Sequence, residues 1–240
     1  HNIENWVENG GALMISGGDD LAAPNSLSVT PLGDILPLHP TGQTFEQAFR
    51  PQISETGERH PLSRGIQYSF SQSQDWGSWY DIAGANASEG ANVLMSDESG
   101  HPLLALSEHG EGRVAMLSSD QSWLWARGHQ GGGPANELTR NLTRWLVKNP
   151  SMEAEDVRLT RQGERLMVEL QTMSDESEDI VITSPSGEQI TVTPEEYRPG
   201  LRRAFIPASE LGVYKAARAG DNPDFAFAEV GLEDPTEMRN

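Results

Sequence analysis

A short apolar segment that ends in a serine and two glycines is the first place where chemistry could occur. Residues 12–16 read Ala-Leu-Met-Ile-Ser, and Gly17, Gly18 and Asp19 follow directly. A serine at a strand end acts as a nucleophile only if a neighbouring base takes its proton. The glycines can offer backbone N–H groups to a ligand, although Asp19 would oppose an anion. Ser16 is thus a candidate nucleophile, and the next three residues are candidate ligand-binding residues.

A second candidate position follows another apolar segment, residues 113–118. Asp120 comes directly after it, at the strand edge where ligands bind in open α/β sheets, and Trp123 could line a pocket with it. Asp120 is also the acid that a hydrolase built on Ser16 would use. The alternative interpretation is a loop acid beside core tryptophans and a small serine at a tight strand end.

Histidines and acidic runs do not form a metal motif in this sequence. His60 and His101 each precede Pro-Leu, and their spacing matches no metal site. The acidic runs at residues 97–98 and 175–179 lack the spacing of a calcium loop. We therefore expect no metal and no cofactor. The glycine-rich stretch at residues 129–133 is a surface loop or a lid.

Composition excludes several classes of function. The chain has 240 residues, a hydrophobic content of 36%, no cysteine and a formal net charge of −19. Thiol catalysis, disulfides and cysteine-bound metals are excluded. The negative charge argues against nucleic-acid binding. Since no apolar run approaches the roughly 20 residues that span a bilayer, we expect no membrane insertion by this part of the chain.

The elements that would position the first candidates belong to an α/β fold. Residues 3–7 carry an amphipathic stripe, Gly10 and Gly11 end that helix, and residues 12–16 form a buried strand. This succession is typical of a parallel α/β sheet. Further strands are expected at residues 91–95, 102–108 and 113–118, the last two as a hairpin, and a helix is expected at residues 136–148.

The pattern changes after Pro150. Short alternating segments bounded by turn residues predict seven strands, at residues 156–160, 165–172, 179–183, 189–193, 201–206, 213–217 and 224–230. Close spacing of this kind favours an immunoglobulin-like β-sandwich. We therefore expect an α/β domain over residues 1–150, a sandwich over residues 151–232 and a linker over residues 233–240.

Three segments of the first domain carry a resemblance to a known family. They are WVENGGALMISGG at residues 6–18, His-Pro-Leu at residues 60–62 followed by the aromatic loop at residues 75–80, and GEGRVAMLSSDQSWLW at residues 110–125, closed by the helix around residues 144–146. Together they resemble the class I glutamine amidotransferase-like domain of large, membrane-anchored bacterial proteins. The resemblance covers roughly residues 1–150.

The resemblance implies a flavodoxin-like, three-layer fold whose first strand and helix would lie before His1. It also implies a parent protein anchored in a bacterial membrane, with this domain on the periplasmic or extracytoplasmic side. An amidotransferase of this class needs a cysteine on a strained turn and a histidine oriented by a glutamate. Ser16 stands about where the cysteine would be, and Ser118, Ser119, Asp120 and Gln121 stand where histidine and glutamate are expected.

The missing catalytic set favours a non-catalytic module that binds a ligand, another protein or other domains of its own parent chain. Two alternatives remain open. One is a hydrolase that uses Ser16 with an acid such as Asp120. The other is a sensor of small ligands or carbohydrates whose binding edge is rich in tryptophan. That edge would comprise Trp76, Trp79, Trp123 and Trp125.

Overall fold

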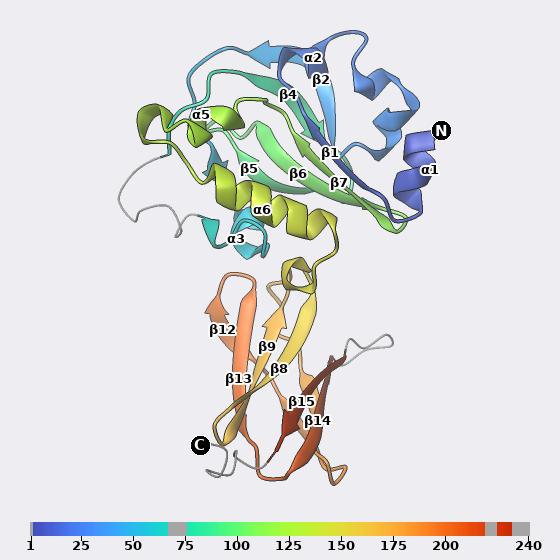
Figure 1. Cartoon of the computed structure of the whole chain (residues 1–240), viewed down its shortest axis with the longest axis vertical. Coiled ribbons are helices and arrows are strands. Elements are labelled where there is room, and N and C mark those ends of the chain that lie inside the picture. Colours follow the sequence, from blue (N-terminus) through green and yellow to red (C-terminus); the bar gives the residue numbers. More distant parts are fainter. Residues whose placement is uncertain (1, 67–75, 219–224, 232–240) are drawn as a thin grey trace, which may run out of the picture. The chain divides into compact units, whose positions relative to one another are not determined.

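The computed structural model describes residues 2–66, 76–218 and 225–231. The chain divides into two compact units, His1–Met152 and Glu153–Asn240 (Figure 1). The first unit is mixed α/β, and strands are the main elements of the second. Each unit has hydrophobic clusters of its own.

A five-stranded sheet forms the centre of the first unit. Its strand order is β1-β7-β6-β5-β3. The bounds are β1 Ala12–Ser16, β3 Gln52–Ile53, β5 Asn92–Ser96, β6 Pro102–His109 and β7 Gly112–Leu117. The β6–β7 hairpin, the strand β5 and the helix near residue 140 are confirmed. A parallel sheet was expected, but among the described strands of this sheet only β1 and β7 pair in parallel. The strands β7, β6, β5 and β3 are antiparallel neighbours.

Short helices and a second, two-stranded sheet surround the central sheet. The strands β2 Leu38–Phe45 and β4 Ile82–Ala87 pair with each other in antiparallel fashion. The α-helices are α1 Asn2–Glu8, α2 Asp19–Ala22, α3 Glu55–Arg59, α5 Ser122–Ala126 and α6 Ala135–Leu146. The 3-10 turns are η1 Leu27–Val29, η2 Pro31–Ile35, η3 His129–Gly131 and η4 Pro150–Met152.

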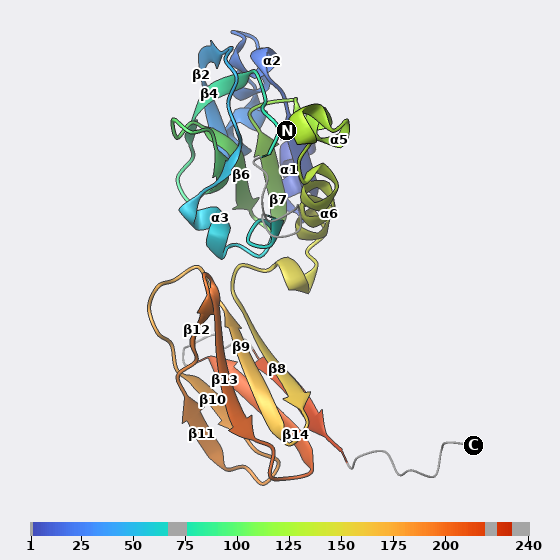
Figure 2. The ribbon, with the colours of Figure 1, turned by 90° about the vertical axis from the view of Figure 1, so that its left-hand side faces the viewer.

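The two faces of the central sheet are covered differently (Figure 2). On one face α6 packs Leu138, Leu142 and Trp145 against strand residues such as Leu117. The other face carries α1, α2 and the β2–β4 pair, with Met116 in its cluster. A flavodoxin-like domain has helices on both faces. Part of this second layer is β instead, because residues 38–45 and 82–87 are extended.

The second unit consists of two four-stranded antiparallel sheets, ordered β11-β10-β14-β15 and β12-β13-β9-β8. The bounds are β8 Asp156–Gln162, β9 Arg165–Gln171, β10 Ile180–Thr183, β11 Gln189–Val192, β12 Glu195–Arg198, β13 Leu201–Pro207, β14 Gly212–Arg218 and β15 Phe225–Val230. Seven of these strands were expected. The strand β12 was not, because its side chains are all exposed and give no alternation.

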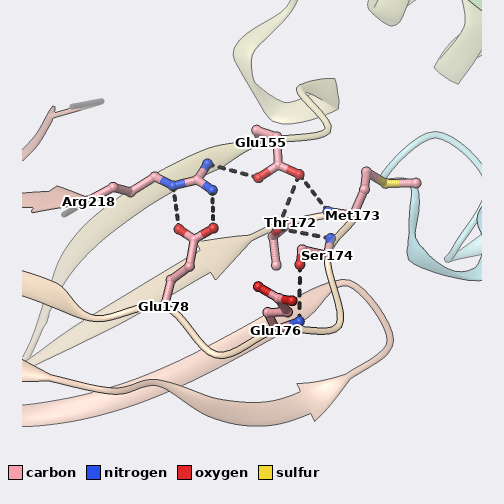
Figure 3. A network of polar contacts seen from close by, with 7 residues as sticks. All are labelled: Glu155, Thr172, Met173, Ser174, Glu176, Glu178 and Arg218. Carbon is pink, nitrogen blue, oxygen red and sulfur yellow. Dashed lines mark hydrogen bonds and ion pairs between the residues drawn. The ribbon is translucent and has the colours of Figure 1, made fainter. Parts of the chain in front are cut away.

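A polar network ties the start of the second unit to its loops (Figure 3). Glu155 accepts hydrogen bonds from the Thr172 hydroxyl at 3.1 Å and the Met173 amide at 2.6 Å. Its other oxygen accepts from the Arg218 guanidinium at 2.8 Å, and that guanidinium also makes two bonds of 2.8 Å to Glu178. Arg218 is thus shared by two carboxylates, which together raise its pKa against the opposing effect of burial.

Candidate functional site

The end of β1 carries Ser16, which is exposed and lies in regular strand conformation. The Ser16 hydroxyl donates a hydrogen bond of 3.0 Å to the backbone oxygen of Ser119. Among the described residues, Gln130 and Lys148 are the non-glycine residues with positive φ, so Ser16 is not on a strained turn. A nucleophile elbow requires such a turn to raise the reactive atom above the sheet. The elbow-like geometry expected at Ser16 is therefore absent.

The end of β7 lies beside the end of β1 because these two strands run parallel, with Ser16 opposite Leu117. Ser118 and Ser119 are buried, and Asp120 is exposed. The Ser118 hydroxyl donates to the backbone oxygen of Pro102 at 2.6 Å, which fixes it within the fold. The structure thus brings Ser16 and Asp120 to one edge of the sheet.

A third segment brings Asp81 to the same edge. The backbone N–H of Ala83, two residues later, donates to the oxygen of Ser118 at 2.7 Å, which fixes the start of β4 against the end of β7. The side-chain amide of Gln121 donates to one carboxylate oxygen of Asp81. The other oxygen, Oδ1, is buried and has no hydrogen-bond partner within the described residues. A Cβ atom on Gly18 would lie 2.6 Å from this Oδ1. Glycine at position 18 therefore leaves room for the carboxylate.

These segments enclose a pocket of about 460 Å³. Its lining contains the predicted Ser16, Gly17, Gly18, Asp19 and Asp120, and it adds Ile15, Asp20, Leu21, Leu27 and Asp81. No histidine is part of this lining in the described chain. The structure therefore gathers five of the sequence-predicted residues in one place and provides no imidazole base beside Ser16.

Asp81 is the residue of the pocket lining whose pKa its surroundings clearly shift. Burial is the main cause that raises its pKa above the ordinary 3.8, and the negative charges of Asp120 and Asp19 add to it. Hydrogen bonds from Gln121 and Ser119 act in the opposite direction. Since the neighbouring like charges disfavour the carboxylate, a positive group in the pocket would offset this repulsion. The site suits a cation and disfavours an anion.

The sequence alone missed Asp81 and Gln121. Asp81 follows an aromatic loop and precedes the strand β4, so no motif marks it. Gln121 was noted only as a residue that stands where a catalytic glutamate or histidine is expected. The one signal in the sequence is that Asp81 lies directly before a strand of small residues, Ile-Ala-Gly-Ala.

The tryptophans of the hypothetical sensor edge are mostly core residues. Trp76, Trp79 and Trp125 have exposed fractions of 9%, 0% and 3%, and their rings contact one another at centroid distances of 4.8 and 5.2 Å. Trp123 is 51% exposed, stacks with the Arg127 guanidinium and is not part of the pocket lining. One tryptophan of the four is thus placed to meet a ligand.

The two histidines considered as metal ligands, His60 and His101, both make contacts within the fold. His60 is buried, and its Nδ1 accepts the Leu62 backbone N–H at 3.1 Å. Burial, followed by the charges of Arg113 and Arg64, lowers the pKa of His60 to about 4. His101 pairs with the buried Asp97 at 2.7 Å. Within the described residues, no group of three His, Cys, Asp or Glu side chains is placed to hold a metal ion.

Comparison with known families identifies the first unit. The sequence model of a family described as "Putative glutamine amidotransferase" matches residues 1–147, well over half of the chain. The protein belongs to this glutamine amidotransferase-like family. A comparison with curated proteins found no match.

The solved structures that match parts of the chain include two cytoplasmic proteins of Salmonella typhimurium, STM3548 and STM1381. The first has 20% identity and a TM-score of 0.49, and the match covers 60% of this chain and 58% of that protein. The second has 19% identity and a TM-score of 0.43, with 63% and 59% covered. A GH42 β-galactosidase from G. stearothermophilus has 11% identity and a TM-score of 0.36, with 85% of this chain and 29% of the enzyme covered. The chain thus spans less than two thirds of each of these proteins.

A search of the described helices for a membrane span found none that is long and apolar enough.

Proposed function

We propose that the first unit is a binding module that keeps the amidotransferase frame without hydrolysing glutamine. The sequence has no cysteine. Ser16, at the corresponding position, donates its hydroxyl hydrogen to a backbone carbonyl oxygen, and no histidine lines the pocket within the described part of the chain. A serine hydroxyl without a base is inert towards an amide.

The ligand of this module carries a positive group, such as an amine or a guanidinium. The observation that carries this proposal is the partly buried Asp81, whose charge is disfavoured by burial and by its acidic neighbours Asp120 and Asp19. An ammonium or guanidinium group in the pocket would reduce the repulsion among these three carboxylates.

Calorimetric titration tests this proposal with agmatine and 1,4-diaminobutane as probes and the uncharged 1,4-butanediol as their control. Both cations should bind, more weakly at high salt because the attraction is electrostatic. Asp120→Asn should weaken binding roughly tenfold, since it removes a charged hydrogen-bond acceptor. The matched control is Asp34→Asn, an exposed acid outside the pocket. Equal binding of the diol, or unchanged binding in Asp120→Asn, would contradict the proposal.

The second unit serves as an immunoglobulin-like spacer or docking surface in this proposal. The buried Tyr214 supports the assignment: its phenolic oxygen accepts the backbone N–H of Glu210 at 2.9 Å, near the start of β14. A tyrosine that bonds back to the chain a few residues upstream is a feature of such sandwiches. Tyr214→Phe should destabilise the second unit by about 1 kcal/mol in denaturant unfolding, because the Glu210 amide loses its acceptor. An unchanged midpoint would weaken the assignment.

We further propose that the parent polypeptide is anchored in a bacterial membrane, with this module on its outer side and another protein or its own neighbouring domains as partners. The support is the resemblance of residues 6–18 and 110–125 to domains of such proteins. Protease treatment of intact spheroplasts tests the placement in cells that make the whole parent protein. Cleavage of the module without lysis is expected, and protection until lysis would overturn the placement.

A further inference from the structure

Two loops that are far apart in sequence are locked together next to the pocket. The Gly77 N–H donates to the Gly132 oxygen at 2.7 Å, and the Trp125 indole N–H donates to the Gly77 oxygen at 2.7 Å. A Cβ atom on Gly77 would overlap the backbone oxygen of His129. The contact is therefore close enough to fix the 77–80 segment against the 128–132 segment.

The locked loops bring a tyrosine, a histidine and a glutamine together at the surface. The phenolic oxygen of Tyr80 lies 2.7 Å from Nε2 of His129, and the Gln130 side-chain amide donates to the same oxygen at 3.0 Å. The oxygen accepts from Gln130, and the Tyr80 hydroxyl donates to the imidazole in the His129 tautomer whose Nε2 carries no hydrogen. Tyr80 is 37% exposed, so a reagent in solution can reach it.

The backbone of Gln130 is strained in a way that serves this cluster. It adopts φ 49° and ψ 37°, in the left-handed region, which costs a residue with a Cβ about 1 kcal/mol. Its side-chain oxygen accepts the Ser78 N–H at 3.2 Å while its amide holds Tyr80. Strain of this kind persists where the surrounding contacts over-determine it, and it is concentrated at functional sites.

We propose that Tyr80 is an activated nucleophile that accepts an acyl group from an uncharged carboxylic ester, with His129 as its general base. Such a site goes beyond the cation-binding pocket and does not depend on it. A hydroxyl beside a base, with a third group oriented on the same oxygen, is the general arrangement of an activated nucleophile. The net charge of −19 and the adjacent Asp81 repel phosphoryl donors and favour an uncharged electrophile.

The reaction balances without a further reagent. The Tyr80 oxygen forms a bond to the ester carbonyl carbon while its proton passes to Nε2 of His129. The bond from that carbon to the leaving oxygen then breaks, and the leaving oxygen takes the proton from His129. The Gln130 amide stabilises the negative charge that develops on the phenolic oxygen. The product is an acyl ester of Tyr80.

The composition makes this reaction easy to observe. The protein has no cysteine and only two lysines, Lys148 and Lys215, so few side chains compete for an acyl reagent. Exposed Tyr197 provides an internal comparison: it is 58% exposed, more than Tyr80, and its ring contacts the Arg203 guanidinium.

The experiment uses p-nitrophenyl acetate, with peptide mass spectrometry to locate the acetyl group and nitrophenolate release to count it. We expect one equivalent to be released and Tyr80 to be acetylated on the order of 100-fold faster than Tyr197, the lower end of the effect of a general base. Equal rates at the two tyrosines, or acetylation mainly at the lysines, would overturn the proposal without any need for a variant.

Variants separate the roles within the cluster. Tyr80→Phe should remove the fast one-equivalent release and leave only the slow background reaction, and His129→Gln should slow the fast release about 100-fold. Gln130→Asn, which tolerates the left-handed backbone but has a shorter side chain, should slow it roughly fivefold, as expected for one lost hydrogen bond. His109→Gln, at the end of β6, is the matched control and should change nothing. A His129→Gln protein that reacts at the original rate would show that no base acts on Tyr80.

Discussion

The carboxyl group of Asp81 is partly buried between Gly18 and Gln121 and faces the charges of Asp120 and Asp19. Because its pKa is raised in the folded state, the unfolded chain gives up this proton more readily. Ionisation therefore opposes folding as the pH rises above 3.8, the ordinary value, towards the raised folded-state pKa. Below that range both states are protonated and the effect disappears.

Asp81→Asn should therefore stabilise the first unit at pH 7. Asparagine keeps an oxygen for the Gln121 amide and removes the charge. We expect a gain on the order of 0.2–1 kcal/mol, since solvent screens a partly exposed carboxylate. Differential scanning calorimetry should show a rise of about 1–3 °C at pH 7 and none at pH 3. A loss of stability at pH 7 would show that the charge of Asp81 is used in the fold.

Ser16→Ala tests the role of the serine at the β1 end. The variant loses the hydrogen bond to the Ser119 oxygen, so its free energy of unfolding should fall by about 0.5–1 kcal/mol. It should bind agmatine normally and react with p-nitrophenyl acetate at the rate of the unmodified protein. If Ser16→Ala abolished a glutaminase or esterase activity, the hydrolase alternative would be restored and the binding-module proposal would fail.

The candidate pocket was partly predictable because five of its residues follow two strands. Parallel neighbouring strands end at one edge, so Ser16 and Asp120 were expected to lie on the same side of the sheet. Asp81 lies at the pocket for a different reason: it precedes β4, and the backbone hydrogen bond from Ala83 to Ser118 holds the start of β4 beside the end of β7. A long-range contact of this kind leaves no periodic trace in the sequence. The pairing of Tyr80 with His129, 49 positions apart, is hidden for the same reason.

At the level of elements, residues with a clear periodicity were placed well. Leu138, Leu142 and Trp145 form the buried stripe that predicted α6. The strand β2 contains Pro40 and Gly42 and its burial does not alternate, so the β layer on the second sheet face was missed. The pairing of β2 with β4 is a tertiary effect: it covers Ala105 and Met116 of the central sheet.

The contact between the 77–80 and 128–132 segments predicts a large effect at Gly77. Gly77→Ala would place a Cβ inside the contact distance of the His129 oxygen, and a backbone atom cannot rotate away. We expect a loss of about 1–3 kcal/mol in chemical unfolding, together with slower acetylation of Tyr80. Gly65→Ala, with open space around its Cβ position, is the control and should be neutral. Equal stability of the two variants would show that the loop contact is not tight.

The Arg218 network of the second unit (Figure 3) predicts that losing Arg218 costs more stability than losing an arginine of an exposed ion pair. Arg218→Met leaves Glu155 and Glu178 without their shared cation. The Arg218 side chain is only 18% exposed, so solvent replaces this cation poorly. We expect a loss of about 1–3 kcal/mol, larger at low salt, in urea unfolding of the second unit. Arg158→Met removes the more exposed pair with Asp156 and should cost less than about 1 kcal/mol. Equal losses would mean that the network adds nothing beyond two surface pairs.

At the scale of the whole molecule, each hydrophobic cluster lies within one unit. The clusters around Trp79, Met116 and Val114 consist of residues up to and including Met152, and the cluster around Tyr214 consists of residues after it. We therefore predict two separate calorimetric transitions, and we expect residues 1–152 and 153–240 to fold when produced alone. A single transition whose midpoint moves when either unit is destabilised would contradict this prediction.

All six tryptophans belong to the first unit, whereas the second unit contains the tyrosines Tyr197 and Tyr214. Indole emission excited at long wavelength therefore originates in the first unit alone. The ring contacts of Trp125 with Trp76 and Trp79 make part of that signal sensitive to the packing near Tyr80 and His129. Tyrosine emission has sources in both units, since Tyr68 and Tyr80 belong to the first. Unfolding of the first unit, or a change at the paired loops, can therefore be followed through indole emission without adding a dye.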